Sequence, residues 1–241
     1  MTQITLTNDI TVQLLKVCAT DRDVLDAARV STMGDLVLEQ LVEEGEVDGV
    51  VKYLMKHRHG TPFEHNMFRF FVNAPIFVWR EWHRHRIGFS YNEESARYTK
   101  LKPVFYLPPP DRPMMKVDGW KPGKPKFLRC TSEDTYEVLC GNLTRSYELA
   151  YRMYEANLNM NIDPGLARDC LPVGIYSSCW VTCNARSLMA FLSLRTHVPT
   201  ARDISYPLYE IEQAALQVET ALSQHMPMTY HAFCNEGRRA P

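Results

Sequence analysis

The sequence predicts a single α+β domain that spans residues 1–241. The chain is long enough to bury a substantial core. Hydrophobic residues make up 45% of it and charged residues 23%, which is ordinary for a globular protein. The expected strands and helices follow one another without regular alternation, which argues against a doubly wound parallel sheet.

The N-terminal part is expected to hold two strands with helices between them. Residues 10–18 predict a strand, and residues 66–73 predict a buried strand rich in aromatic side chains. The stretch 21–58 has a helical pattern, in which Gly34 and Gly45 are expected to be interruptions.

A further helix is expected from Pro75 through residue 86, because the first helical turn does not need the N–H that proline lacks. Apolar side chains lie in the first half of this segment and cations gather at its end. Residues 107–126 are rich in proline and lysine, which predicts an exposed loop and the one internal boundary of the chain.

The C-terminal half predicts mainly helices. A long amphipathic helix is expected at 133–158, because apolar residues recur there at spacings of three and four. The dipeptide Asp163-Pro164 is a good helix start, and that helix must end before Pro172. The remaining elements are a strand at 173–183, a helix capped by Asn184 at 185–195, and a helix at 207–224.

Composition excludes several classes of protein. The net charge of −1 is not that of a polycation that coats nucleic acid. No apolar run approaches the roughly 18 residues of a transmembrane helix, and the N-terminus lacks the pattern of a signal peptide. We therefore expect a cytoplasmic protein with no membrane or nucleic-acid partner.

The seven cysteines are odd in number and occur without a secretion signal, so we expect reduced thiols. Cys179 and Cys183 flank an apolar run, where buried core cysteines are a better interpretation than metal ligands. Neither of the common glycine-rich nucleotide loops is present.

Five of the eight histidines lie between residues 57 and 85, and three interpretations compete. A metal site is disfavoured, because His-x-His side chains point apart on a helix and there is no HExxH. The histidines could be ordinary core and surface residues of a cation-rich helix. Alternatively the segment binds phosphate, since Arg84, His85 and Arg86 are donors that suit an anion.

The residues that follow favour the phosphate interpretation. Glu93 or Glu94 can accept from sugar hydroxyls, and Ser95 and Arg97 add a hydroxyl and another cation. This set of donors and acceptors is the chemistry that recognises a nucleotide or dinucleotide. The alternative is a solvated charged loop.

More arginines occur in the C-terminal half, at positions 168, 186 and 195. Arg186 and Arg195 are nine residues apart, and therefore about 180° apart on an ideal helix. Both edges of that helix then carry a cation, toward different ligands or subunits. The alternative is two ordinary surface arginines.

Four motifs resemble those of the flavin-dependent thymidylate synthases. They occur in that family's order over roughly residues 50–225. The motifs are HGTPFEH at 59–65, RHRIGFSYNEESARY at 84–98, ARDCLP at 167–172 and NARSLMAFLSLR at 184–195.

The resemblance implies an α/β fold with a central mixed or antiparallel sheet flanked by helices. It implies a homotetramer whose active sites are shared between subunits, with FAD as cofactor. Such enzymes transfer a methylene from 5,10-methylenetetrahydrofolate to C5 of dUMP, and NADPH reduces the flavin that supplies the hydride. They need no enzyme cysteine bonded to C6, which agrees with the lack of a cation-flanked cysteine here.

The resemblance also implies roles for individual residues. Arg195 would stabilise the charge that develops as the pyrimidine N3 side loses its proton, and His59 would lie at the flavin and folate side near Glu64. Ser95 is a nucleotide contact, because an unassisted serine is a poor nucleophile. The substrate-binding residues implied are Glu81, Arg84, Ser95, Ala96, Arg97, Arg168 and Arg195. The flavin-binding residues implied are Thr61, Arg84, His85, Arg86, Glu93, Asn184, Arg186 and Ala190, and no metal is implied.

Several positions depart from the family pattern. Residues 87–94 form a spacer that is one residue longer than usual. Glu81 stands where a glutamine is usual, Ala190 replaces an asparagine, residues 196–204 look inserted, and Tyr206 replaces a histidine. A longer spacer changes the space available around the ribose of the nucleotide. Relatives in nucleoside-antibiotic pathways methylate UMP as well as dUMP. A UMP/dUMP methylase is therefore the alternative function.

Two other classes of protein remain possible alternatives. One is an RNA-binding protein that stacks bases on the Arg/His/aromatic segment, which the near-neutral charge disfavours. The other is a metal-dependent hydrolase. Bound flavin discriminates both from the synthase.

Overall fold

The computed structural model describes residues 2–34, 44–119, 121 and 126–241. It divides the chain into two compact units. The first unit consists of Met1–Thr11, Val72–His83 and Asn92–Cys179, and the second consists of Val12–Phe71, Arg84–Tyr91 and Trp180–Pro241. The mixture of strands and helices without regular alternation confirms the mixed α/β class.

The internal boundary predicted at residues 107–126 is wrong, because the described residues of this stretch, 107–119, 121 and 126, lie within the first unit. Part of it is β6 (Pro113–Lys116), which pairs antiparallel with β7 (Phe127–Arg129). The carbonyl of Pro108 also accepts a hydrogen bond of 2.8 Å from the Tyr136 hydroxyl. These bonds tie the proline-rich stretch to its neighbours, so it does not act as a linker.

The main sheet has four strands in the order β2–β3–β8–β4. Their bounds are β2 (Thr11–Cys18), β3 (Met67–Pro75), β4 (Phe89–Glu93) and β8 (Tyr176–Cys183). The structure confirms the strands predicted at 10–18, 66–73 and 173–183. Along β3 buried residues alternate with half-buried ones, as the two-residue period of a strand requires. β8 begins later than predicted because the amide of Ile175 donates to the carbonyl of Pro172 in a turn.

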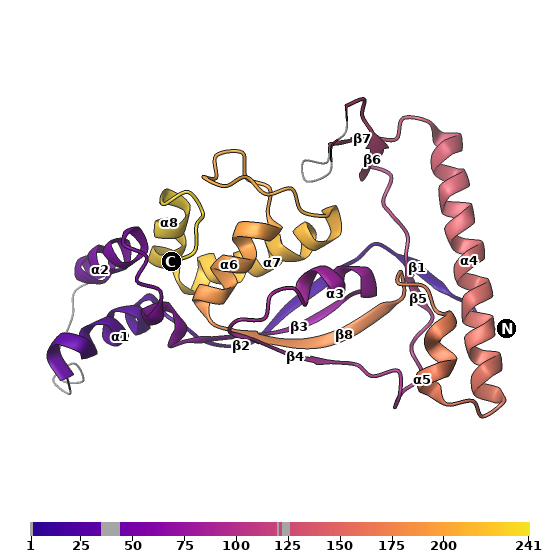
Figure 1. The fold of residues 1–241 in the computed structure, drawn as a ribbon, viewed down its shortest axis with the longest axis horizontal. Coiled ribbons are helices and arrows are strands. Elements are labelled where there is room, and N and C mark those ends of the chain that lie inside the picture. Colours follow the sequence, from indigo (N-terminus) through magenta and orange to yellow (C-terminus); the bar gives the residue numbers. More distant parts are fainter. Residues whose placement is uncertain (1, 35–43, 120, 122–125) are drawn as a thin grey trace. The chain divides into compact units, whose positions relative to one another are not determined.

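The long helix α4 (Glu133–Asn159) confirms the helix predicted there (Figure 1). Its buried tyrosines belong to the hydrophobic core cluster of the first unit. The ring of Tyr147 stacks on Phe105 with centroids 4.7 Å apart. The hydroxyl of the buried Tyr151 donates to the carbonyl of Leu101 at 2.9 Å, so its polar end is satisfied. The small parallel pair in this unit is β1 (Thr5–Thr7) and β5 (Val104–Tyr106).

The helix predicted from Pro75 to residue 86 is shorter than expected. As predicted, Pro75 precedes the first turn, but α3 (Ile76–Trp82) ends before the cationic run. Two carbonyls after it bind side chains instead of helical amides. His85 accepts from the Tyr91 hydroxyl at 2.6 Å, and Ile87 accepts from the Ser187 hydroxyl at 2.8 Å. The cations therefore project from a turn, and the argument that placed the histidines on a helix does not apply.

The second unit begins with α1 (Asp21–Met33), whose N-terminus carries a capping box formed by Thr20 and Asp23. Gly34 ends this helix as predicted, with φ of +58°. The interruption predicted at Gly45 is wrong, because Gly45 lies in the first turn of α2 (Glu44–Lys56). A glycine near a helix end breaks no interior hydrogen bond.

Three helices complete the second unit (Figure 1). α6 (Ala185–Arg195) and α7 (Tyr209–His225) confirm the two predicted helices. α8 (Pro227–Asn235) was not predicted. The carboxylate of Asp21 accepts from the amides of Met228 and Thr229 at 2.9 and 2.8 Å, so a residue distant in sequence caps its N-terminus.

All seven cysteines are free thiols. Cys179 and Cys183 are buried, as predicted. Burial raises the pKa of Cys179 to about 12 and raises that of Cys183 further. Across the part of the chain that the structure describes, no helix is long and apolar enough to cross a membrane.

Candidate active site

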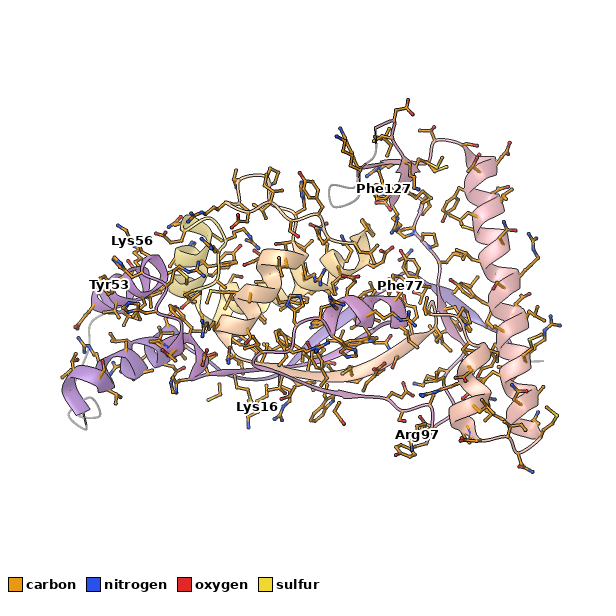
Figure 2. The ribbon with its side chains drawn as sticks, viewed as in Figure 1. Lys16, Tyr53, Lys56, Phe77, Arg97 and Phe127 are labelled. Atoms are coloured by element: carbon orange, nitrogen blue, oxygen red, sulfur yellow. The ribbon has the colours of Figure 1, made fainter. Side chains whose placement is uncertain are left out.

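The second unit contains a cavity of about 670 Å³. Its wall comes from α1, α2 and the 3-10 helix η2 (Thr61–Glu64), with Arg186 of α6. Tyr53, labelled on α2 in Figure 2, contributes an aromatic surface. The cavity's basic residues are Arg29, Arg58, His59, His65 and Arg186, and no Asp or Glu is among its described lining residues. Arg29 pairs with Glu46 and Arg186 with Glu64, two carboxylates outside the lining. The lining thus offers donors to an anion, although two of its arginines share their charge with a carboxylate.

The end of α2 brings His59 to this wall. Arg58 adopts the left-handed conformation with φ of +60°, which is uncommon for a residue other than glycine. The amide of His59 then donates at 2.9 Å to the carbonyl of Leu54, as in a helix C-terminal cap. The reversal places Arg58, His59 and Thr61 in one wall.

Two hydrogen bonds hold the guanidinium of Arg186. Its Nη1 donates to Oε1 of Glu64 at 2.5 Å, and its Nε donates to the carbonyl of Pro241 at 2.9 Å. The side chain lies against Gly60, where an added Cβ would be 2.5 Å from the Arg186 Cζ. Gly60 therefore leaves the space that Arg186 occupies.

The N-terminus of α6 is fixed by side chains from two elements. Oδ1 of Asn184 accepts from the Ser187 amide at 2.9 Å, which confirms the predicted cap. Oδ1 of Asn66 accepts from the Ala185 amide at 2.7 Å. Ala190, further along the helix, is exposed.

The opposite end of α6 carries Arg195, whose Nε donates to Nε2 of His85 at 3.0 Å. Burial, and then the positive charge of Arg195, lower the pKa of His85 to about 4. His85 is therefore neutral near pH 7. Arg84 and Arg86, on either side of it, are exposed.

The first unit brings several of the predicted nucleotide contacts together. Ala96 is buried in the same core cluster as Ala167, which directly precedes Arg168. Arg97 lies beside the start of α5 (Pro164–Ala167), with its Cγ 3.5 Å from the Cβ position of Gly165 (Figure 2). Two exposed cations, Arg97 and Arg168, thus lie on segments that pack together.

Three other predicted residues also lie in the first unit. Ser95 Oγ accepts a long hydrogen bond of 3.4 Å from the Arg97 amide, so its side chain closes a turn. Glu93 is exposed at the end of β4, and Glu81 is half-buried on α3.

Asp163 caps α5 through the Gly165 amide at 2.9 Å, which confirms the helix start predicted at Asp163-Pro164. That helix is only one turn long and continues as the 3-10 helix η3 (Arg168–Cys170).

Residues 13–228 match the family model described as thymidylate synthase complementing protein. The flavin-dependent thymidylate synthase of Streptomyces coelicolor is 49% identical to the chain, and the match covers 99% of this chain and 96% of the relative. The chain belongs to the flavin-dependent thymidylate synthase family. The motif resemblance is thereby confirmed. A member from Tropheryma whipplei is 44% identical, and that match covers 97% of this chain and 96% of the relative.

Solved structures agree with this family assignment. The UMP/dUMP methylase PolB from Streptomyces cacaoi, bound with 5-Br dUMP, superimposes with a TM-score of 0.92 at 45% identity, covering 99% of this chain and 100% of PolB. The same enzyme bound with 5-Br UMP gives a TM-score of 0.91 at 43% identity, covering 100% of both chains. The fold is therefore that of PolB.

The cavity wall contains residues that were not singled out from the sequence. Arg29 and Ser31 on α1, and Tyr53 and Arg58 at α2, line it. For Arg58, its position directly before the HGTPFEH motif was the sequence signal that could have identified it as a site residue. Within the described ranges, no group of three His, Cys, Asp or Glu side chains is arranged to hold a metal ion.

Proposed function

We propose that this family member catalyses the flavin-dependent C5 methylation of a uracil nucleotide, dUMP to dTMP. The methylene comes from 5,10-methylenetetrahydrofolate. Family membership at 49% identity over nearly the whole chain is the observation that carries this proposal. The cationic cavity and the placement of Arg195 support it.

The cavity of the second unit fits the phosphates of FAD. It combines several cations with an aromatic wall, and its volume lies within the usual range of cofactor sites. We assign Thr61 and Arg186 to the flavin, because both line the cavity and arginine binds phosphate with a planar fork of donors. The other residues proposed for the flavin are Arg84, His85, Arg86, Glu93, Asn184 and Ala190. Bound FAD, once reduced by NADPH, supplies the hydride that completes the methyl group.

The nucleotide is proposed to bind through the exposed cations of the first unit. Arg97 and Arg168 lie on neighbouring segments and suit its phosphate. Ser95 and Ala96 provide a hydroxyl and a small buried side chain in the same loop. Glu81 and Arg84 complete the proposed contacts.

Arg195 is the residue proposed to activate the pyrimidine. Its guanidinium stabilises negative charge on the ring, which makes C5 more nucleophilic. His59 is proposed to lie on the folate side of the flavin, since it shares the cavity wall with Thr61.

Three of the seven cysteines support a reaction without an enzyme thiolate. Burial is the main cause that raises the pKa of Cys170, Cys179 and Cys183, and a raised pKa disfavours the nucleophilic thiolate. This agrees with the family chemistry, in which no cysteine bonds to C6.

UMP is a second candidate substrate. PolB, which superimposes over the whole chain, is a UMP/dUMP methylase that has been seen with both 5-Br UMP and 5-Br dUMP. The longer spacer at residues 87–94 supports the same interpretation. Methyl transfer to UMP compared with dUMP at equal concentration tests it. Turnover of dUMP alone would exclude the alternative.

We also propose that the enzyme is a cytoplasmic homotetramer with active sites shared between subunits. In this proposal residues 1–241 act as one domain, with no nucleic-acid or membrane partner. Light scattering on the eluting protein tests the tetramer. Mixing Arg195→Ala with Arg186→Ala subunits tests shared sites, because restored activity requires residues from both.

The decisive experiment is the visible absorption spectrum after FAD is added and unbound FAD is removed. A retained flavin spectrum supports the synthase against the RNA-binding and metal-hydrolase alternatives, and its absence contradicts it. Arg186→Lys should weaken FAD binding roughly 10-fold, because lysine lacks the fork of a charge-assisted contact. Arg22→Lys is the matched control, since Arg22 also pairs with a carboxylate, that of Asp26, but lies outside the cavity wall.

A further inference from the structure

We infer that His85 is a positioning residue for Arg195: its Nε2 accepts the Nε–H of Arg195 and fixes the plane of that guanidinium. The inference rests on the proposed function, in which Arg195 meets the pyrimidine. It extends the role of His85 beyond a flavin contact.

The hydrogen bond determines which form of the imidazole is present. Arg195 Nε lies 3.0 Å from His85 Nε2. Arginine carries only donors, so Nε2 must be the acceptor, with an unshared electron pair. A neutral imidazole has one protonated nitrogen, so the proton of His85 resides on Nδ1. Nδ1 is therefore the donor in any contact that His85 makes to the flavin.

This contact restricts rotation of the guanidinium plane of Arg195, and that rotation would change where its donors point. The Nε–H bond lies in the plane of the guanidinium, so an acceptor fixed at Nε opposes rotation of that plane. The two Nη groups are then held in a defined orientation. A preorganised donor stabilises developing charge better than one that must reorient during the reaction.

His85 is itself held on several sides. Its ring packs edge-on against Phe191, with centroids 5.0 Å apart, and lies 6.1 Å from the ring of Phe89. Its carbonyl accepts the Tyr91 hydroxyl at 2.6 Å. Phe191 and Arg195 are four residues apart on α6 and so share a helix face. One face of α6 thus supplies both the packing surface for the imidazole and the guanidinium that it holds.

The imidazole must be neutral to act in this way. A protonated His85 has no acceptor and would repel Arg195. Burial and the charge of Arg195 favour the neutral form, so the contact persists over the pH range in which such an enzyme is assayed.

A double-mutant cycle in flavin-saturated enzyme tests the inference. His85→Phe keeps a ring but removes the acceptor, and we expect kcat to fall roughly 10- to 100-fold, the range for a hydrogen bond to a charged group. In an Arg195→Ala background the same change should cost less than about twofold, because His85 acts through Arg195. Multiplicative losses in the double variant would overturn the inference.

A conservative variant and a matched control complete the kinetic test. His85→Gln places an amide oxygen at similar reach and should recover most of the kcat lost in His85→Phe. No recovery with flavin still bound would count against the hydrogen bond. His231→Phe changes an exposed histidine of α8 in the same way and should leave kcat unchanged.

Nitrogen-15 NMR of the histidine rings supplies a readout that does not depend on turnover. We expect His85 to carry its proton on Nδ1, with Nε2 unprotonated, and Arg195→Ala should change the Nε2 signal. A proton on Nε2 in the wild-type protein would refute the contact. If wild-type protein binds no flavin and methylates no uracil nucleotide, the proposed function fails, while the NMR result still decides the contact.

Discussion

Arg186 and Glu64 are joined by a hydrogen-bonded ion pair of 2.5 Å between Nη1 and Oε1, although 122 positions separate them in the chain. The pair connects the first turn of α6 to η2, and therefore two of the motifs found in the sequence. Their side chains are 42% and 36% exposed. Solvent screens such a pair, so we assign it an orienting role at the cavity more than a stabilising one.

Replacing Gly60 separates the placement of Arg186 from the stability of the fold. The backbone of Gly60 is helical, with φ of −79° and ψ of −30°, so alanine is tolerated there. The new Cβ would lie 2.5 Å from Cζ of Arg186 and displace that flexible side chain. We expect Gly60→Ala to fold with a nearly unchanged Tm and to bind FAD roughly 10-fold more weakly, as measured by fluorescence titration.

Gly49→Ala is the matched control for that variant. Gly49 lies within α2, and an added Cβ meets no atom within 4 Å. The change should stabilise the protein by about 0.5–1 kcal/mol and leave FAD affinity unaltered. Wild-type FAD affinity in Gly60→Ala would show that the position of Arg186 is unimportant for the flavin.

Asn184 is expected to have two separable roles, in capping α6 and in contacting the flavin. Its Oδ1 accepts from the Ser187 amide, and serine can replace that cap. Asn184→Ala should lower the free energy of unfolding by about 1 kcal/mol, whereas Asn184→Ser should leave it nearly unchanged. Both variants lack the side-chain amide, so both should weaken FAD binding.

Urea denaturation and FAD titration of the two variants decide between these roles. Full FAD affinity in Asn184→Ser would restrict Asn184 to the cap. Equal stability of the serine and alanine variants would mean that the cap contributes little to the free energy of unfolding.

Local patterns in the sequence predicted most elements because the responsible interactions are themselves local. The Asn184 cap and the three- and four-residue spacing of α4 depend on neighbours within a few residues. α8 shows the limit of such patterns. Its N-terminus is capped by Asp21, 207 residues away from Met228, so the neighbouring residues supply no side-chain cap and Pro227 at the first position was the available local signal.

The candidate site likewise has residues that sequence motifs named and features that only tertiary contacts determine. The motifs named Thr61, Arg186, His85 and Arg195 by family resemblance, and the structure places Thr61 with Arg186 and His85 with Arg195. The end of α3 was misjudged, because the carbonyls of the following turn bind distant side chains such as that of Ser187. Such tertiary hydrogen bonds override a local helical pattern.

The low pKa of His85 predicts how stability depends on pH. Its pKa is about 4 in the folded protein and about 6.5 when exposed, so the unfolded chain binds more protons between these values. The free energy of unfolding should therefore fall as the pH is lowered from about 6.5, by at most about 1.4 kcal/mol per pH unit from this group. Below about pH 4 both states are protonated and the contribution is fully lost.

Urea denaturation of wild type and His85→Phe at a series of pH values tests this dependence. The difference between the two unfolding free energies should change only between about pH 6.5 and 4, since His85→Phe cannot take up the proton. Parallel curves through this range would show that His85 titrates normally. His231→Phe should follow the wild-type curve.

The network around Glu219 should contribute strongly to stability. Its Oε1 accepts from Arg238 Nη1 at 2.6 Å and from the Tyr230 hydroxyl at 2.9 Å, and the Glu219 and Arg238 side chains are only 13% and 8% exposed. Arg238 Nη2 also binds the hydroxyl of Thr196, the residue after Arg195. Glu219→Ala leaves a buried cation without its carboxylate, and we expect the free energy of unfolding to fall by about 3–5 kcal/mol.

Urea denaturation again gives the measurement, with Asp48→Ala as the control. Asp48 pairs with Lys52 on α2 at 2.5 Å, but both side chains are in contact with solvent, so its loss should cost less than about 1 kcal/mol. Glu219→Gln keeps an acceptor oxygen and should lie between wild type and Glu219→Ala. Similar losses in Glu219→Ala and Asp48→Ala would mean that water reaches Arg238 once the carboxylate is gone. The network would then hold the end of α6 in place without being a main source of stability.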